Sequence, residues 1–328
     1  MKKILAITVA SIIAAGSITA CSAEASNNEV SDEKISIVTT IFPEYDWVMN
    51  VLGDNPAGAE VTMLLDDGVD LHSYQPTVDD IMKIADCDLF IYVGGESDEW
   101  VEDALAEATN DDMIVINLLD VLGDSVVEEE TVEGMEAEEE EGEEGEEEGP
   151  EYDEHVWLSL RNAKVLVESI EEALVTIDPD NESTYCQNAD SYVAELTVLD
   201  EEYSAVVSQA ACDTVLFGDR FPFRYMTDDY GLNYYAAFVG CSAETEASFE
   251  TITFLANKVD ERSLNAVLTI EGADHSIAET IVENTAAQDQ QILTLDSMQS
   301  VTASDVEAGA SYISIMESNL VVLREALS

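Results

Sequence analysis

Basic side chains are scarce in this sequence: 11 Lys and Arg stand against 72 Asp and Glu in 328 residues, for a formal net charge of −61. A polyanion of this strength repels the phosphates of nucleic acids and the headgroups of anionic lipids, which excludes a nucleic-acid binder. Hydrophobic residues nevertheless make up 46% of the chain, far more than a disordered acidic protein contains. The composition therefore predicts a folded, acidic body with room for about two domains.

The sequence also lacks an apolar run of the roughly 20 residues that span a bilayer. The longest run near the start, Ile4–Ala15, follows a basic beginning and has about twelve residues. The small residues after it end in Ile18-Thr19-Ala20-Cys21, which resembles a bacterial lipobox, in which the cysteine becomes the lipidated first residue. We therefore predict a lipoprotein signal peptide at 1–20 and a tether at 21–33. An ordinary cleaved signal with a chance cysteine is the alternative.

Cysteine is sparse and never occurs in a Cys-x-x-Cys spacing, which speaks against a zinc ribbon or a thioredoxin-like redox motif. Beyond Cys21 the chain has Cys87, Cys186, Cys212 and Cys241. Extracellular proteins form disulfides, but the pairing is left open here. Catalytic signatures such as His-Glu-x-x-His, Gly-x-Ser-x-Gly and a phosphate-cradling glycine loop are missing too, so we do not expect an enzyme.

Apolar runs typical of strands alternate with amphipathic stretches of helical length. Four runs lie on each side of the middle of the chain, at 35–39, 60–65, 88–93 and 113–117 and then at 214–217, 234–239, 266–270 and 291–295. The helical stretches include 77–85, 99–108, 249–262 and 276–285. This alternation favours parallel sheets covered on both faces, so we predict an α/β protein with two parallel-sheet lobes, 34–180 and 211–328.

The segment 181–210, between the predicted lobes, has helical periodicity. Its apolar residues alternate in spacings of 4 and 3, at Tyr185, Ala189, Tyr192, Leu196, Leu199, Tyr203 and Val206. At about 1.5 Å per residue, one helix of this length could run the height of the molecule. We predict a single backbone helix that joins the lobes and restrains hinge bending; an ordinary packed helix inside one lobe is the alternative.

Acidic residues concentrate at 128–148, where 14 of 21 residues are Glu, and continue to Glu154. A run of like charges cannot fold on its own. We therefore predict an exposed loop, 128–154, inserted in the first lobe just before His155. It serves either as a solvated loop or as a weak collector of divalent cations.

Histidine occurs only three times, at His72, His155 and His275. His72 lies in a polar turn directly after the second predicted strand, and His155 lies where the acidic loop ends. Ligand sites of α/β sheets form beyond the carboxyl ends of the strands, where both of these residues are expected. A lone histidine is more often structural than metal-binding, but this placement favours metal ligands that face a cleft.

Several segments together resemble the zinc- and manganese-binding class of ABC-transporter solute-binding lipoproteins. They span nearly the whole chain after the signal, and they are Ile37–Pro43, His72–Thr77, Ala85–Tyr92, His155–Ala163, Leu196–Tyr203 and Ser311–Leu320. The resemblance implies two lobes joined by a rigid helix, with one divalent ion held between them. Many zinc-binding members carry a loop rich in His and acidic residues where the Glu run lies here.

The ligands of that class carry over one position at a time. The first two histidines fall on His72 and His155, and the carboxylate after the last strand falls on Asp296. The remaining ligand, normally His or Glu, falls on Arg220 when the segment is anchored on Tyr230-Gly-Leu232. Arginine cannot bind a metal because its guanidinium has no available lone pair and is always charged. One expected ligand is therefore lost.

Residues near the lost ligand offer replacements. Glu271 closes the strand at 266–270, His275 opens the next helix, and Asp219 lies beside Arg220. We favour Glu271 or His275. An arginine close to the ion would oppose cation binding unless it pairs with a carboxylate, so a remodelled cleft for a metal chelate or another small ligand is an alternative.

The resemblance implies a lipid-anchored protein on the outer face of the cell membrane or in the periplasm, which captures Zn2+, or next Mn2+, and delivers it to an ABC-transporter permease. We expect a monomer held to the membrane by its lipid only. Two alternatives belong to other classes: a surface adhesin with the same fold, and a metallohydrolase, since two histidines and a carboxylate are also a catalytic zinc set.

The signal analysis generates a first prediction. Substitution Cys21→Ala should release the protein into the medium or leave it unprocessed, because the lipid would be attached to this thiol. Cell fractionation followed by immunoblotting measures the outcome. Membrane retention equal to that of the wild type would contradict the lipid anchor.

Overall fold

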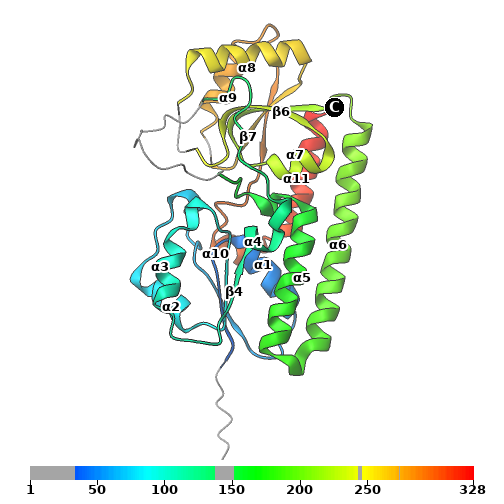
Figure 1. Cartoon of the computed structure of the whole chain (residues 1–328). Helices are drawn as coiled ribbons and strands as arrows, with labels where there is room; N and C mark the ends of the chain where they lie inside the picture. The colour runs from blue at the N-terminus through cyan, green and yellow to red at the C-terminus, as the bar shows by residue number, and fades with distance from the viewer. Residues whose placement is uncertain (1–33, 137–150, 243–245, 273) are drawn as a thin grey trace, which may run out of the picture. The chain divides into compact units, whose positions relative to one another are not determined.

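The structure is a computed structural model that describes residues 34–136, 151–242, 246–272 and 274–328 (Figure 1). The predicted signal peptide, tether and Cys21 lie outside the described residues, as do residues 137–150 of the acidic loop. Within the described ranges, no helix combines the length and the apolar character needed to cross a membrane.

The first lobe is built on a four-stranded sheet whose neighbours are all parallel, in the order β2-β1-β3-β4. Its strands are β1 (Ser36–Thr39), β2 (Glu60–Met63), β3 (Leu89–Tyr92) and β4 (Ile114–Asn117). Its helices include α1 (Phe42–Leu52), α2 (Val78–Asp86), α3 (Trp100–Ala106) and α4 (Leu118–Leu122). The central strand β1 is buried from Ile37 to Thr39 because its two neighbours and the flanking helices cover it.

The second lobe repeats this plan with the order β6-β5-β7-β8, again all parallel. Its strands are β5 (Thr214–Phe221), β6 (Asn233–Val239), β7 (Ala266–Ile270) and β8 (Gln291–Leu295), and its helices include α7 (Arg224–Tyr230), α8 (Phe249–Arg262) and α9 (Ser276–Glu283). All five residues of β7 are buried, as a central parallel strand requires. The predicted α/β class with two parallel-sheet lobes is confirmed.

The long helix α6 (Glu182–Gln209) runs along both lobes (Figure 1). Near its start, the Tyr192 hydroxyl donates to Asp46 Oδ2 of α1 at 3.0 Å. Near its end, the Tyr203 hydroxyl donates to the backbone oxygen of Met316 at 2.7 Å. Met316 belongs to α11 (Tyr312–Ala326), which contacts β7 and β8 of the second lobe. The predicted helix that joins the lobes is therefore confirmed, and the alternative of a helix inside one lobe is wrong.

This helix is not a lone connection, because other segments also tie the lobes together. Helix α5 (Leu160–Ile177) packs beside α6, and α10 (Ala303–Glu307) returns to the first lobe, where Ala303 N donates to the Asp66 carbonyl at 2.8 Å. The Tyr312 ring then lies edge-on to Trp47 of α1, with centroids 5.3 Å apart. Part of the predicted C-terminal lobe 211–328 thus packs against the first lobe.

The hydrophobic core is continuous between the two sheets. One cluster of buried side chains contains Ile37 and Phe90 of the first lobe together with Phe217 and Leu268 of the second. Residues 34–328 accordingly form one compact unit. Separating the lobes would expose this shared core, so the arrangement resists wide opening more strongly than a flexible hinge would.

The contact between α1 and α6 generates a prediction. Asp46 is buried, and burial raises the pKa of its carboxyl from 3.8 to about 6 despite the opposing hydrogen bonds from Tyr192 and Asn50. The stabilisation from this group is complete below pH 3.8 and is lost as the pH rises through about 6. Asp46→Asn should therefore gain up to about 3 kcal/mol in unfolding free energy over the wild type as pH increases through this window.

Urea unfolding at either end of that pH window measures this gain. The matched control is Asp54→Asn, which changes an exposed carboxylate just after α1. Its difference from the wild type in unfolding free energy should be the same at both pH values. A difference between Asp46→Asn and wild type that does not change with pH would contradict the prediction.

Candidate metal centre

His155 is fully buried at the boundary of the two lobes, directly before the short helical turn Val156–Leu158. Its ring Nδ1 lies 3.0 Å from Asp153 Oδ1, which also accepts the His155 N–H at 2.9 Å. An ionised carboxylate can only accept, so Nδ1 carries a hydrogen, and Nε2 has the lone pair when the ring is neutral. Burial opposes a charge on this ring, but Asp153 outweighs it and raises the pKa of His155.

His72 lies in the 3₁₀ helix Leu71–Ser73 beyond the carboxyl end of β2, and Asp70 Oδ1 accepts its backbone N–H at 3.0 Å. Its ring Nδ1 lies 2.7 Å from Ser97 Oγ and 3.5 Å from Glu154 Oε2. Burial, together with the charge on the adjacent His155, lowers the pKa of His72 to about 3. The ring is therefore neutral in neutral solution, and its Nε2 has the lone pair for a metal in the tautomer that carries the hydrogen on Nδ1.

The two imidazoles face each other, with Nε2 of His72 and Nε2 of His155 only 3.2 Å apart. With the hydrogens placed on both Nδ1 atoms, two lone pairs point at the same small region. Zinc binds imidazole nitrogen at about 2.0–2.1 Å in tetrahedral geometry, which places two such nitrogens about 3.3 Å apart. The pair therefore has the spacing of two ligands that share one ion.

A third donor, Cys241, follows the carboxyl end of β6 beside this pair. In the part of the chain that the structure describes, His72, His155 and Cys241 form the one group of three or more potential ligands whose donor atoms all lie within 4.8 Å of one another. The four described cysteines are free thiols. Sequence reasoning missed Cys241 as a ligand, although its place two residues after a predicted strand was the available signal.

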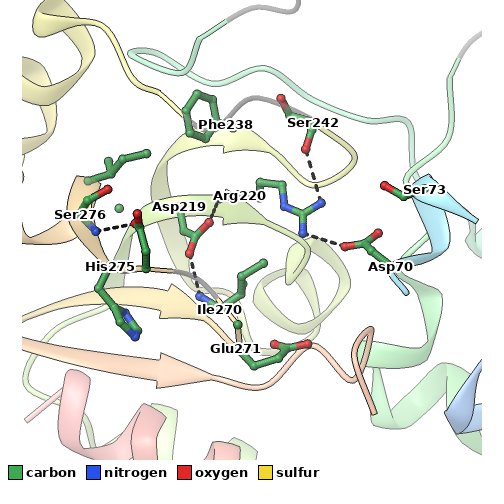
Figure 2. A pocket seen from close by; sticks show the side chains of 14 residues that line it. Asp70, Ser73, Asp219, Arg220, Phe238, Ser242, Ile270, Glu271, His275 and Ser276 are labelled. Atoms are coloured by element: carbon green, nitrogen blue, oxygen red, sulfur yellow. Dashed lines mark hydrogen bonds and ion pairs between the residues drawn. The ribbon is translucent and has the colours of Figure 1, made fainter. Parts of the chain in front are cut away.

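Arg220, at the position where the resemblance predicted a ligand, is paired with a carboxylate from the other lobe. Its Nη2 lies 2.7 Å from Asp70 Oδ2, and its Nη1 donates to the Ser242 carbonyl at 3.4 Å. Figure 2 shows this pair at a cavity of about 480 Å³ that residues of both lobes line. Since Asp70 neutralises the guanidinium, Arg220 does not leave an unpaired positive charge beside the histidines.

The structure does not bring the predicted ligands Asp296, Glu271 and His275 into the three-residue group. Glu271 accepts hydrogen bonds from Ser297 N, Ser297 Oγ and Gln299 N, so its carboxylate holds the loop after β8. Asp296 Oδ1 accepts Met298 N at 2.8 Å in the same loop, and burial together with Glu271 raises the pKa of Asp296 to about 6.

His275 and Asp219 also lie outside the three-residue group. In Figure 2 the His275 ring points away from the Arg220–Asp70 ion pair, and the residue caps the start of α9 in a left-handed conformation with φ 60°. Asp219 accepts the backbone N–H groups of Arg220 and Ile270, at 2.8 and 3.1 Å, and so joins β5 to the end of β7.

The described start of the acidic segment is docked on the second lobe, which corrects its prediction as an exposed loop from residue 128 onward. Glu128 forms a β-bridge with Tyr152, Glu130 forms an ion pair with Arg224, and Glu136 N donates to Ala237 O at 2.9 Å. Glu129 Oε1 accepts the Cys241 N–H at 3.4 Å. Part of the predicted loop therefore supports the donor group.

A two-lobed α/β body with a histidine pair at its cleft has the features of the solute-binding class that the sequence predicts. The chain belongs to the family described as zinc-uptake complex component A, periplasmic, whose model matches residues 37–326.

Individual proteins of known name are similar to this chain over most of its length. The chain is 32% identical over 300 residues to the zinc-binding lipoprotein AdcA of Streptococcus pneumoniae serotype 4, covering 92% of this chain but only 57% of AdcA. It is 28% identical to the high-affinity zinc uptake system protein ZnuA of Bacillus subtilis, covering 90% of this chain and 88% of that protein. The Zn(II)-bound ZnuA-like domain of Streptococcus pneumoniae AdcA superposes with a TM-score of 0.69 at 29% identity, covering 90% and 99% of the two chains.

The acidic segment generates a prediction that compares two variants, in each of which the replacement keeps the length of the chain. Replacing residues 137–150 by an uncharged sequence should leave tight metal binding unchanged and remove weak additional binding, because the described donor group consists of His72, His155 and Cys241, whereas the nine Glu of this stretch attract cations by their charge alone. Extending the replacement to 128–150 should also weaken the tight site, because Glu129 contacts Cys241.

Isothermal titration calorimetry with zinc resolves the tight and the weak phases. Loss of the tight phase in the shorter replacement would show that residues 137–150 supply a primary ligand.

Proposed function

We propose that this chain is a lipid-anchored solute-binding protein that captures one divalent metal ion, with zinc first and manganese second, and delivers it to an ABC-transporter permease. The observation that carries the proposal is the 3.2 Å separation of His72 Nε2 and His155 Nε2, with each Nδ1 held by a neighbouring polar group. Such a pair is stable when a cation lies between its lone pairs, and the relatives AdcA, a zinc-binding lipoprotein, and ZnuA, a zinc uptake system protein, support zinc.

The surroundings of the pair suit a cation. Carboxylates of Asp70, Asp153 and Glu154 contact the two imidazoles or their backbone, and the nearby Arg220 is neutralised by Asp70. Local negative charge attracts a divalent ion and compensates for its lost hydration. An anionic chelate would be repelled by the same groups, so the bare ion is the better ligand.

Delivery to a permease requires that the loaded and empty proteins differ in shape. His72 and His155 precede α5 in the chain, whereas Cys241 and Asp296 follow strands of the second lobe, so an ion with ligands from both sides links the lobes. We retain Asp296 as a candidate ligand of the loaded state, reached by a shift of the loop after β8. The Arg220–Asp70 ion pair already links the two lobes.

We place this function ahead of the two alternatives. A surface adhesin would bind its partner by exposed residues and would not need a buried histidine pair. A metallohydrolase needs an open coordination position beside a substrate-sized pocket with a general base, whereas His155 is fully enclosed. We therefore propose no catalytic role.

The test is thermal unfolding of chelator-stripped protein with and without zinc. A ligand that binds only the folded state should stabilise it by about 4 kcal/mol at a thousandfold excess over the dissociation constant. His72→Ala and His155→Ala should abolish most of this stabilisation. The third histidine supplies a matched control, because His275→Ala should keep the full shift.

Two results would contradict these assignments. A melting temperature of the stripped wild type that zinc, manganese and iron all leave unchanged would exclude the metal-binding function. Loss of the shift in His275→Ala would instead return His275 to the ligand set.

A further inference from the structure

We propose that Cys241 supplies a thiolate ligand in place of the residue lost at Arg220, which makes the centre a His₂Cys site that prefers zinc over manganese. The inference rests on the proposed metal-binding function and names a ligand that sequence reasoning did not consider. Its first support is geometric: the Cys241 Sγ and the two imidazoles have donor atoms within 4.8 Å of one another.

Gly240 brings this thiol to the histidines. A Cβ atom on Gly240 would lie 2.8 Å from Cε1 and 3.0 Å from Nδ1 of His155, and 3.0 Å from the backbone oxygen of Phe221. Distances this short are not tolerated, so only glycine lets the end of β6 lie directly against the His155 ring. The backbone that carries Cys241 is therefore shaped to approach the ligand pair.

The neighbours of Cys241 hold it in place from both sides. Glu129 Oε1 accepts its N–H at 3.4 Å, and the carbonyl of the next residue, Ser242, accepts from Arg220 Nη1 at 3.4 Å. Arg220, which stands where a ligand was expected, thus holds the segment that contains Cys241, the proposed replacement ligand. Figure 2 shows Arg220 between Ser242 and Asp70. The Asp70 carboxylate in turn accepts the backbone N–H of His72.

The chemistry of a third, sulfur donor sets the metal preference. When the ion binds, the Cys241 S–H bond breaks, its proton goes to the solvent, and the sulfur electron pair forms the metal–sulfur bond. Thiolates are soft ligands that suit zinc, whereas manganese suits carboxylate, carbonyl and water oxygen. Two imidazoles alone discriminate less between the two ions, so the thiolate is the main source of selectivity.

Cobalt substitution tests the ligand directly, because cobalt(II) takes zinc sites and absorbs strongly in the near ultraviolet when bound to sulfur. The stripped wild type loaded with cobalt should show this charge-transfer band, and Cys241→Ser should lack it. Cys212→Ser is the matched control, since that half-buried thiol of the same lobe lies outside the donor group and the band should persist.

Selectivity is measured by competition between zinc and manganese. We expect Cys241→Asp to lower the preference for zinc over manganese on the order of 10- to 100-fold. For comparison, loss of an outer-shell partner lowers metal affinity by about the same factor. An unchanged preference would overturn the assignment of selectivity to the thiolate.

A measurement on the unmodified protein guards against a variant that fails to fold. Zinc should protect Cys241 from iodoacetamide, whereas alkylation of Cys186 and Cys212 should be unaffected; peptide mass mapping distinguishes the three thiols. Equal alkylation of Cys241 with and without zinc would overturn the inference.

The outcomes separate this inference from the proposed function. A wild-type cobalt complex without the sulfur band, in which His72→Ala still abolishes cobalt binding, would reject Cys241 as a ligand and leave the metal-binding function standing. Failure of the stripped wild type to bind cobalt or zinc at all would reject both.

Discussion

The candidate metal centre depends on the orientation of the His72 and His155 imidazoles, whose Nδ1 atoms are held by other side chains. Asp153 fixes His155, and Ser97 with Glu154 fixes His72, so both Nε2 atoms face the same point 3.2 Å apart. A neutral histidine has one hydrogen and one lone pair on its ring nitrogens, and a hydrogen-bond acceptor at Nδ1 decides which nitrogen has which. The outer groups therefore favour both rings as ligands of the proposed metal ion.

Much of the remaining structure serves to hold these outer groups in place. Asp153 is bound by Val127 and by Tyr225 of α7, and the Trp157 indole donates to the Ser297 carbonyl of the second lobe at 2.9 Å. The Tyr312 hydroxyl donates to the Trp157 carbonyl at 2.7 Å. Contacts from both lobes thus meet around His155, so a metal bound at this proposed ligand would be sensitive to the relative position of the lobes.

Strand and helix positions were predictable because they follow local periodicity. All eight predicted strands are present, and 266–270 and 291–295 match β7 and β8 residue for residue. The prediction omitted α5 beside α6 and the return of α10 to the first lobe. A hydrophobic pattern shows that a face is buried but not which partner buries it, so interlobe packing was outside the reach of periodicity.

For the candidate metal centre, the sequence by itself showed that histidine and cysteine are few and that His72 and His155 follow structured elements. It also showed an arginine at 220, where the resemblance implies a ligand. Only the tertiary structure decided that Arg220 pairs with Asp70 and that Glu271 binds the loop after β8. It also placed Cys241 beside residues 169 and 86 positions earlier in the chain. Metal ligands act through distances of a few ångströms, and such distances between remote segments are set by how the strands assemble into sheets and the sheets into lobes.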